Sequence, residues 1–492
     1  MTAPAKTQAR RGPDACCDPG LARALEAVRK IIGPDGSVDA TPQAWNVSMF
    51  RPRTVHAVVR PTTAEQVRAV LRVFDDPDLS SGLHAYSTGR NWGLGSREPA
   101  RDHAVALDLG GLDRVRDLDL VHGWAVVEPG VTQGALAALL AGSDRMLNVT
   151  AASAHTSVVG NILDRGVGVR RQRTEDLAGL EVVLPDGELV RTGWWPVPGR
   201  PPAAVYPYGL GPSLLHLFTQ SDLGVVTAAA VRLPSRPEAQ RMLRLGFTRD
   251  RLSPAVDMLR RWMAQGLVSG VVKVYDMVSA QFYGGRAGEF LAHLCVTGTH
   301  RSATALAEVL LKEAAECGLF SYAGQSDTDD AVVAMLEHTH AGDPGHNDAM
   351  LQATLGQPAD RVDKHGEGWL FFMPMVPFHG DGVSRAYGLL ERIQDESGVR
   401  PGCTVNGLSP DLVDFVVTIR FSRSEEAARQ AHRVLDRAHE LFHAEGFVPY
   451  RLDVDHAGWL DRLSPDPAGL ALVRRLKQWI DPNSAIAPGR YA

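Results

Sequence analysis

VVGNILDRGVG, residues 158–168, is the stretch from which the fold can be recognised. Two valines lead into Gly160 and Asn161, and two further glycines follow within the next eight positions. Glycine is favoured where a neighbouring group comes too close to the main chain for a Cβ atom. The first question is therefore what lies against this backbone.

Composition and charge define the broad class of the chain. Its 492 residues, 44% hydrophobic and 22% charged, suffice for two or three domains. Lys and Arg number 51 and Asp and Glu 57, so the net charge of -6 gives no general attraction to nucleic acid or anionic lipid. The sequence shows neither a secretory signal nor an apolar run long enough to span a membrane. The odd, scattered cysteines favour a reducing cytoplasm: Cys16, Cys17, Cys295, Cys317 and Cys403.

Changes in pattern along the chain predict its domain organisation. Residues 1–19 resemble a mobile tail, and the next segment predicts a helix capped by Asp18 and ended by Gly33. From about residue 55 to 236, short strands alternate with helices, which indicates an α/β domain. Residues 237–445 combine β-rich segments with long helices, which predicts an antiparallel sheet with helices on one face. Residues 446–492 form a C-terminal segment.

A glycine-rich loop, STGRNWGLGS at residues 87–96, follows a predicted strand. Its main-chain amides suit an anionic diphosphate, although such a loop is more often an ordinary turn. It lacks the Lys of a Walker loop and the glycine spacing of a Rossmann turn. Similar segments recur at 127–132, 158–168 and 221–227. Together they favour a large ligand with a diphosphate and planar rings, which would exclude side chains from the glycine positions.

The order of these motifs resembles a known family. GRNWGLG, VVEPGVT, GNILDRGVG, LEVVLPDGELVRTG, YPYGLGPSLLHLFTQSDLGVVT and IDPNSAIAPGRYA are similar to segments of the FAD-dependent vanillyl-alcohol oxidase and p-cresol methylhydroxylase (PCMH) family, in its branch acting on 4-substituted phenols. The resemblance implies an α+β protein with a two-subdomain PCMH-type FAD-binding domain at 20–236 and a substrate (cap) domain at 237–445. It also implies that residues 446–492 return to the FAD-binding domain.

The resemblance also implies the cofactor-binding residues. Thr88, Gly89, Arg90, Asn91, Trp92 and Gly93 would form the diphosphate loop. Pro129, Gly130, Gly160, Asn161 and Gly166 would line the flavin and its ribityl chain. Val225 would contact the adenine side, and Arg490 would approach from the tail.

In the phenol-oxidising members, a Tyr-Arg pair holds the substrate as a phenolate while a substrate carbon gives up a hydride. GFVPYRLD supplies this pair as Tyr450 and Arg451. An always-charged guanidinium beside a phenol lowers the pKa of that phenol and binds the oxyanion. The alternative is an ordinary surface pair.

Four departures from the family pattern affect chemistry. Leu94 and Val169 replace two substrate-site tyrosines, and NVTAASAHTSV at 148–158 lacks the family's carboxylate. LVDFVV at 412–417, which contains Phe415, has neither the His nor the Tyr that binds flavin covalently in relatives. These departures predict a noncovalent FAD and an altered substrate.

Several further residues are candidates for the substrate site, each with a structural alternative. His155 could act as a local base or hydrogen-bond the substrate, or it could be structural. Arg170, with Arg171 and Arg173, could bind an acidic group or form a solvated face. His379 could line the pocket or belong to the core. The expectation for metal is none: His338, His340, His346, Asp343 and Asp348 could bind zinc, but a polar loop is favoured.

The expected function is that of an FAD-dependent oxidoreductase. It would accept hydride from a benzylic, allylic or carbinol carbon of a small, phenolic substrate and pass electrons to oxygen or another acceptor. One alternative is a tailoring enzyme for a bulkier natural product, and another is a flavin-binding cyclase or isomerase without net redox chemistry. Because relatives commonly pair, a homodimer is a further expectation.

Overall fold

The computed structural model describes residues 18–39, 46–95, 97–197, 199, 204–325, 331–487 and 491. Cys16, Cys17 and Arg490, and nearly all of the expected 1–19 tail, lie outside these ranges. The first helix, α1 (Pro19–Ile32), has the expected cap, because the Asp18 carboxylate accepts the Gly20 N–H at 2.8 Å and Gly33 ends the helix. Among the described helices, none is long and apolar enough to cross a membrane.

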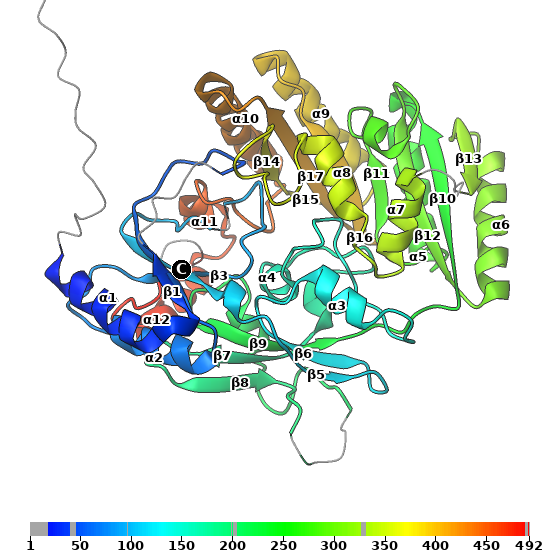
Figure 1. Ribbon diagram of the computed structural model, residues 1–492. Helices are drawn as coiled ribbons and strands as arrows, with labels where there is room; N and C mark the ends of the chain where they lie inside the picture. Colours follow the sequence, from blue (N-terminus) through cyan, green and yellow to red (C-terminus); the bar gives the residue numbers. More distant parts are fainter. Residues whose placement is uncertain are drawn as a thin grey trace, which may run out of the picture.

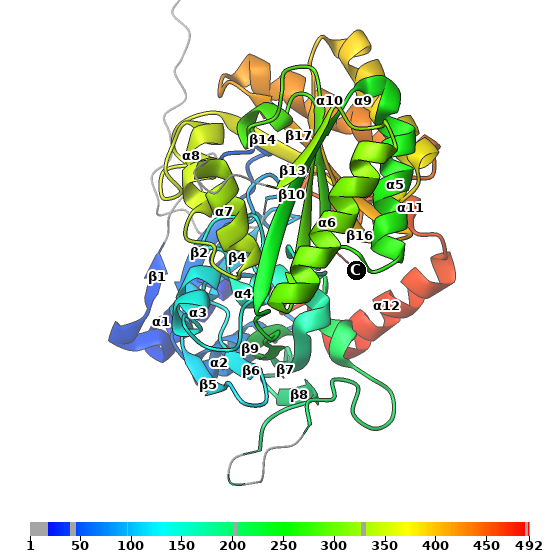
Figure 2. The same ribbon diagram turned by 90° about the vertical axis from the view of Figure 1, so that its right-hand side faces the viewer.

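Two sheets form the lower part of the molecule in Figures 1 and 2. The first has the order β1-β2-β4-β3, with strands β1 (Ser37–Asp39), β2 (Val55–Arg60), β3 (Leu83–Tyr86) and β4 (Ala104–Asp108). In it β4 pairs in parallel with both β2 and β3. The apolar faces of α1 and α2 (Ala64–Phe74) pack on this sheet and form one core.

The second sheet is antiparallel, in the order β5-β6-β9-β7-β8. Its strands are β5 (Val115–Asp119), β6 (Trp124–Val127), β7 (Leu177–Val183), β8 (Leu189–Gly193) and β9 (Val225–Arg232). Helices α3 (Gln133–Leu139) and α4 (Val158–Leu163) contribute to its core. Strands β7 and β9 are buried along almost their whole length, which is typical of strands covered on both faces.

A third sheet, the cap sheet, stands above the first two in both views (Figures 1 and 2). Its antiparallel path is β13-β10-β12-β11-β16-β17-β14, and β15 also pairs with β17. The strands are β10 (Ala239–Phe247), β11 (Val272–Tyr275), β12 (Phe290–Gly298), β13 (Tyr322–Gln325), β14 (Gly368–Phe372), β15 (Met375–Pro377), β16 (Gly402–Ser409) and β17 (Leu412–Phe421).

Helices lie on both faces of the cap sheet, whereas the sequence predicted helices on one face. Four long helices bury the main cap core: α5 (Leu252–Ala264), α6 (His300–Glu316), α9 (Gly380–Ser397) and α10 (Glu425–Ala444). The shorter α7 (Ala331–His340) and α8 (Asn347–Leu355) stand on the opposite side in both views (Figures 1 and 2). Period-two burial in β17 fits this arrangement, since alternate side chains point to opposite faces.

The chain then returns to the first sheet. After α11 (Leu460–Leu463) and α12 (Pro467–Ile480), the segment 481–487 runs beside β3. The Leu83 N–H donates to the Ala485 carbonyl and the Ala487 N–H donates to the Leu83 carbonyl, both at 2.8 Å. The buried Lys477 ammonium fixes this segment by donating to Asp481 at 2.6 Å and to the Ile486 carbonyl at 3.2 Å.

The glycines of VVGNILDRGVG lie against the protein's own side chains. A Cβ on Gly160 would stand 2.3 Å from Ser87 Oγ, and one on Gly166 would stand 2.2 Å from Asn161 Oδ1. Gly168 is crowded in the same way by Asn148. The expectation that a ligand alone excludes these side chains is therefore corrected: internal packing already requires the glycines.

Candidate functional site

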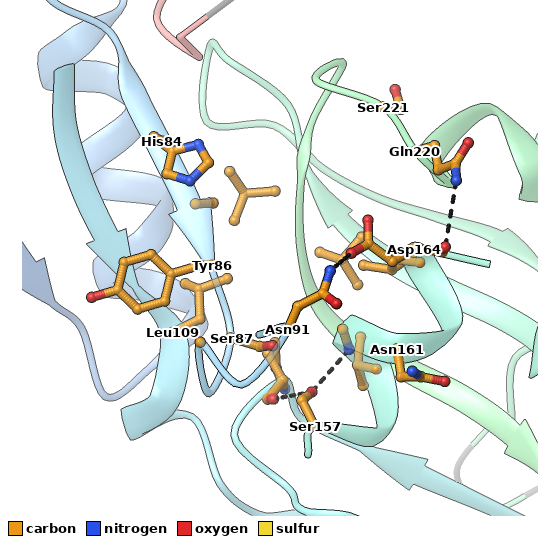
Figure 3. A pocket seen from close by; sticks show the side chains of 18 of the residues that line it. His84, Tyr86, Ser87, Asn91, Leu109, Ser157, Asn161, Asp164, Gln220 and Ser221 are labelled. Atoms are coloured by element: carbon orange, nitrogen blue, oxygen red, sulfur yellow. Dashed lines mark hydrogen bonds between the residues drawn. The ribbon is translucent and has the colours of Figure 1, made fainter. Parts of the chain in front are cut away.

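A pocket opens where the first two sheets, the start of α4 and the returning C-terminal segment meet (Figure 3). One wall is β3 and the loop after it, residues 83–91. Residues 486 and 487 complete this wall. The second wall consists of α4 and residues 218–226. Arg451 and Tyr491 reach the pocket from the C-terminal region. The lining of this pocket therefore combines residues 83–226 with residues from the C-terminal region, 451–491.

Eight of the predicted cofactor-binding residues line this pocket. They are Thr88, Gly89, Arg90, Asn91, Pro129, Gly160, Asn161 and Val225. Gly89 has a φ of 64°, a left-handed conformation that glycine adopts without strain. The loop can thereby turn directly after β3 and present main chain to the pocket.

Four predicted cofactor-binding residues do not line it. Trp92 packs against Val47 and Leu351 and directs its indole N–H to Asp363. Gly93 approaches the Phe371 ring instead. Gly130 and Gly166 are packed against main chain and against the Asn161 side chain, respectively. A glycine pattern alone does not tell a ligand contact from an internal one.

The start of α4 is shaped to receive a polar ligand. Ser157 caps the helix: its hydroxyl accepts the Gly160 N–H at 2.9 Å and donates to the Pro129 carbonyl at 2.6 Å (Figure 3). Asn161 Oδ1 is buried and has no hydrogen-bond partner among the described residues. A buried amide oxygen without a partner is costly unless a ligand or water satisfies it. Together with the main chain of the 87–91 loop, these groups fit a cofactor with a diphosphate and a hydrogen-bonding ring.

Sequence reasoning missed several pocket residues. They include Tyr491 and seven residues labelled in Figure 3, namely His84, Tyr86, Ser87, Leu109, Asp164, Gln220 and Ser221. His84 and Tyr86 alternate on β3, directly before the glycine loop, and that position was the available signal. Asp164 and Gln220 lie inside the quoted family motifs, but their side-chain directions depend on the fold.

Arg451 of the predicted Tyr450-Arg451 pair lines this pocket and is buried, and the partly exposed Tyr450 lies beside it. The Arg451 guanidinium donates to the Tyr450 hydroxyl at 3.0 Å and to Asn91 Oδ1 at 3.4 Å. It also faces Asp164 at 3.6 Å. Arg451 is only 9% exposed, so it does not form an ordinary surface pair. Burial raises the pKa of Tyr450, which keeps its hydroxyl protonated as a hydrogen-bond donor.

Asp164 organises the groups around Arg451. One carboxylate oxygen accepts from the Asn91 amide at 2.7 Å, and the other accepts from the Tyr491 hydroxyl at 3.0 Å (Figure 3). The Gln220 amide donates to the Tyr450 carbonyl at 2.9 Å. The diphosphate loop, α4 and the Tyr-Arg segment are therefore joined in one polar network.

The other predicted substrate residues are not brought to the pocket. Leu94 and Val169 are buried in packing positions, and the exposed His155 lies outside the pocket lining. Arg170 is held by the His340 carbonyl at 3.0 Å and by Gln240 at 2.8 Å. The neighbouring Arg173 is buried, so this run of arginines is not simply a solvated face.

His379 and Phe415 have structural roles, in a helix cap and in the cap core, respectively. His379 caps α9, because its Nδ1 accepts the Gly382 N–H at 2.9 Å. Phe415 is fully buried against Phe442 on the helix-covered side of the cap sheet. The adjacent Asp414 points to the opposite side, where it accepts from Asn406. A shift of one residue along a strand exchanges the two faces.

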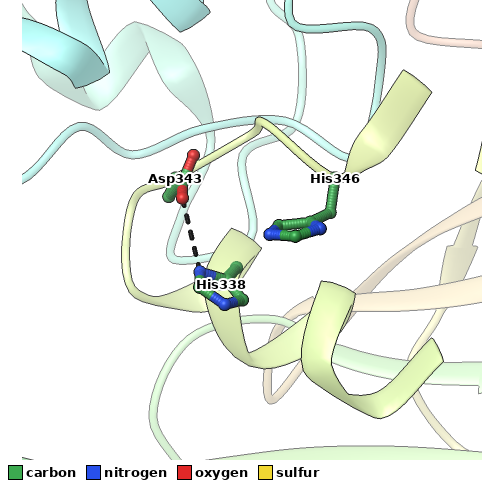
Figure 4. Close-up of side chains that lie close together, drawn as sticks. All are labelled: His338, Asp343 and His346. Carbon is green, nitrogen blue, oxygen red and sulfur yellow. Dashed lines mark ion pairs between the residues drawn. The ribbon is translucent and has the colours of Figure 1, made fainter. Parts of the chain in front are cut away.

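The possible zinc ligands come together only in part (Figure 4). His338 pairs with Asp343 at 3.3 Å and its ring lies 4.4 Å from that of His346, but all three residues are exposed. His340 turns inward and hydrogen-bonds the Leu336 carbonyl, and burial lowers its pKa to about 3. His338 and His346 therefore lie together at the surface, whereas His340 points away from them into the core.

A buried His-Asp-His cluster near Arg451 was not predicted. His439 of α10 and His456 both contact the Asp453 carboxylate, at 3.2 and 2.9 Å, and their rings stack 3.8 Å apart. The same carboxylate accepts the N–H groups of Asp455 and His456. This cluster fastens the segment after Arg451 to the cap.

Comparisons with known proteins agree with the site. A family model described as an FAD binding domain matches residues 55–193. The chain is 28% identical to the 1'-carboxy-chondrochloren decarboxylase of Chondromyces crocatus over 533 residues, covering 96% of this chain and 97% of that protein. It is 25% identical to the flavoprotein subunit of the hydroxylating 4-cresol dehydrogenase of Pseudomonas putida over 502 residues, 95% of each.

The solved structure of p-cresol methylhydroxylase with substrate bound superposes with a TM-score of 0.84 at 22% identity, over 96% of each chain. Fold, pocket and relatives together define an FAD-dependent oxidoreductase with the α+β PCMH-type fold. In sequence and fold the chain is similar to members of the vanillyl-alcohol oxidase and PCMH family.

Proposed function

We propose that this enzyme binds a small aromatic substrate as a phenolate and removes a hydride from its benzylic, allylic or carbinol carbon. The observation that supports this proposal is the buried Arg451 guanidinium at the FAD pocket, hydrogen-bonded to the Tyr450 hydroxyl. A buried guanidinium stabilises an oxyanion far more strongly than one in water. The two side chains therefore suit a phenol oxygen rather than an aliphatic alcohol.

Different residues would bind the cofactor and the substrate in this reaction. Bound FAD supplies the hydride acceptor. The 88–91 loop and the Gly160-Asn161 pair would hold the cofactor. Arg451 and Tyr450 would hold the phenolate oxygen, whose electron density moves through the ring toward the carbon that loses hydride. Asp164 and Asn91 fix the guanidinium in place.

We also propose that the FAD is held without a covalent bond. On β17, Val413, Phe415 and Val417 belong to the helix-covered core, while Asp414 and Val416 alternate with them. None of these is the His or Tyr expected of a covalent link. Acid precipitation should leave the yellow colour in the supernatant. Colour retained in the washed pellet would contradict this proposal.

Anaerobic mixing with 4-alkylphenols and 4-hydroxybenzyl alcohols tests the function directly. We expect these compounds to bleach the flavin absorbance near 450 nm, and the same compounds with the phenol O-methylated to leave it unchanged. Bleaching by both series would contradict phenolate binding. Substrate conversion without any bleaching under single-turnover conditions would indicate a redox-neutral cyclase or isomerase.

A tailoring role on a bulkier natural product is the second candidate. The full-length similarity to a 1'-carboxy-chondrochloren decarboxylase favours it, as do Leu94 and Val169 in place of larger tyrosines. Comparing rates of flavin reduction by simple phenols and by phenols with large or carboxylated side chains separates the two. Faster reduction by the larger set would favour the tailoring role.

The remaining assignments are proposals of the same kind. We propose domain boundaries at 20–236, 237–445 and 446–492, a cytoplasmic enzyme, and a homodimer. Reoxidation in air, compared with an artificial acceptor, distinguishes an oxidase from a dehydrogenase. Light scattering of the purified protein gives the oligomeric state.

A further inference from the structure

A row of polar side chains crosses the cap sheet on the face away from the four long helices. Lys273 on β11 stands opposite Asn406 on β16, and Asn406 stands opposite Asp414 on β17. The Lys273 ammonium donates to Asn406 Oδ1 at 2.9 Å, and the Asn406 amide donates to Asp414 Oδ2 at 3.3 Å. His293 on β12 extends the row beyond Lys273.

These groups are buried but incompletely satisfied. Asp414 is 2% exposed, and its Oδ1 has no hydrogen-bond partner among the described residues. Neither ring nitrogen of the buried His293 has one. Native proteins rarely leave buried polar groups in this state without a ligand, water or functional reason. A carboxylate oxygen that remains available in an apolar surrounding is a natural proton acceptor.

Asp414 is joined to the Tyr450-Arg451 pair through one short segment. Met375 pairs with Asp414, and its N–H donates to the Val448 carbonyl at 2.9 Å. The Tyr450 N–H donates to the Met373 carbonyl at 3.3 Å. The charge of Arg451 acts on Asp414, and the charge of Asp414 acts on Tyr450. The carboxylate therefore belongs to the surroundings of the phenol-binding pair.

When a phenol binds as a phenolate, its proton passes either to solvent or to a base in the protein, and the pair itself cannot supply that base. Arg451 is a permanent cation and burial keeps Tyr450 protonated. Both Asp164 oxygens already accept hydrogen bonds. Neither Asp414 nor the exposed His155 lines the pocket, but Asp414 is linked to the pair through residues 373–375. Asp414 has the required available oxygen.

We propose that Asp414 accepts the phenolic proton of a substrate bound by Tyr450 and Arg451, with Lys273 acting through Asn406 as a positioning residue. This inference rests on the proposed function. The substrate O–H bond breaks, the proton joins Asp414 Oδ1, and the electron pair stays on the phenol oxygen facing Arg451. No oxidant is needed for this step, because the hydride leaves the substrate only afterwards.

The ionisation of the row agrees with this role. Burial raises the pKa of Asp414 to about 6, against the opposing effects of the Asn406 hydrogen bond and the charges of Arg451 and Lys273. Burial lowers the pKa of Lys273 to about 8. At neutral pH Asp414 is mostly ionised and able to take a proton, and the nearby Lys273 favours that state.

The test is to count protons when holoenzyme binds 4-chlorophenol, which has no benzylic hydrogen to lose. At pH 7.5 the free ligand is mainly neutral. Ultraviolet difference spectra show whether it binds as phenolate, and titration calorimetry in two buffers of different ionisation heat gives the protons released. The wild type should show the phenolate band with almost no proton released. Asp414→Asn should lose the band, or keep it while releasing about one proton per ligand.

Asp411→Asn is the matched control, since this exposed carboxylate lies on the same β16-β17 hairpin. It should behave as the wild type. Lys273→Met should shift the appearance of the phenolate band to higher pH, because removing the cation raises the pKa of Asp414. If Asp414→Asn yields no folded holoenzyme, the test uses Asp414→Glu and Lys273→Met instead. Asp414→Glu should retain the phenolate band without releasing a proton.

The outcomes separate the two proposals. If 4-chlorophenol binds the wild type as phenolate but releases one proton, or if Asp414→Asn matches the wild type, the inference about Asp414 is wrong and the phenolate function stands. If 4-chlorophenol binds only as the neutral phenol, or does not bind, while the flavin is intact, the phenolate function itself fails.

Discussion

The FAD pocket and the inner face of the cap sheet differ in how their polar side chains are paired by hydrogen bonds. Around the pocket, Asn91, Asp164, Arg451 and Tyr491 form one connected network, although Arg451 Nε and Asn161 Oδ1 have no partner among the described residues. On the cap sheet, Asp414 and His293 are each 2% exposed and keep atoms without partners among the described residues. The pocket thus holds a connected polar network around the place of the cofactor, whereas the cap-sheet row leaves the hydrogen-bonding capacity on which the proposal for Asp414 rests.

Replacing Arg451 should cause the largest functional loss. Arg451→Met removes the cation that would face the phenolate oxygen and leaves Asp164 without it. Because loss of one such electrostatic contact typically lowers rates about 100- to 1000-fold, we expect that reduction in the rate of flavin reduction by substrate. Stopped-flow absorbance measures the rate. Arg451→Lys should recover part of it, and an unchanged rate in Arg451→Met would contradict the role.

Disrupting the buried His439-Asp453-His456 cluster, which fastens the segment after Arg451 to the cap, should have the largest effect on stability. Asp453→Asn removes a buried carboxylate that binds His439, His456 and two main-chain N–H groups. Loss of one partner in such a buried network costs about 3–5 kcal/mol of the free energy of unfolding. Urea denaturation measures it. The control is Asp436→Asn, whose side chain is 60% exposed and should cost under about 1 kcal/mol.

Gly160→Ala tests whether internal packing, and not only the cofactor, requires a glycine at the pocket. Gly160→Ala places a Cβ 2.3 Å from Ser87 Oγ, and overpacking of this kind costs about 1–3 kcal/mol. We expect a lower melting temperature and weaker FAD binding, measured by the ratio of flavin to protein absorbance. Adding Ser87→Ala should restore both. Failure of the double variant to recover would mean that Gly160 is required by the cofactor itself.

The smallest effect is a pH dependence of stability. Burial alone would lower the pKa of His456, but hydrogen bonds to Asp436 and Asp453 outweigh it and raise the pKa to about 9. A raised histidine pKa stabilises the fold fully below the unfolded value near 6.5, and this contribution is lost as pH rises toward 9. Urea titrations at pH 6, 7.5 and 9 should show the decline, and His456→Gln should flatten it. A stability that rises over this range would contradict the assignment.

Local sequence patterns predicted the elements and much of the pocket. The 88–91 loop, Gly160 and Asn161, which the family resemblance implied as cofactor-binding residues, line the same pocket. Tyr450 and Arg451 were found through a motif and do lie together at the pocket. Patterns of this kind carry information about main-chain geometry, which is local.

The substrate face could not be predicted in the same way. Phe415 was chosen and Asp414 overlooked, although one position separates them, because the face that each presents depends on which side the helices cover. His439 and Asp453 lie 14 residues apart and meet only through packing of α10. Trp92 and Gly93 continue a correct motif but turn away toward Val47 and Phe371. Long-range packing, which no local pattern contains, decided each case.

The pairing of residues 485–487 with Leu83 has a consequence for how the enzyme is made. This late segment supports β3, the strand that leads into the 87–91 loop, and it supplies part of the pocket lining. A chain still on the ribosome, or one cut before residue 481, has the glycine loop but lacks this wall. We therefore expect FAD to bind tightly only after the C-terminal segment has been synthesised, and chains that end before residue 481 to contain less flavin.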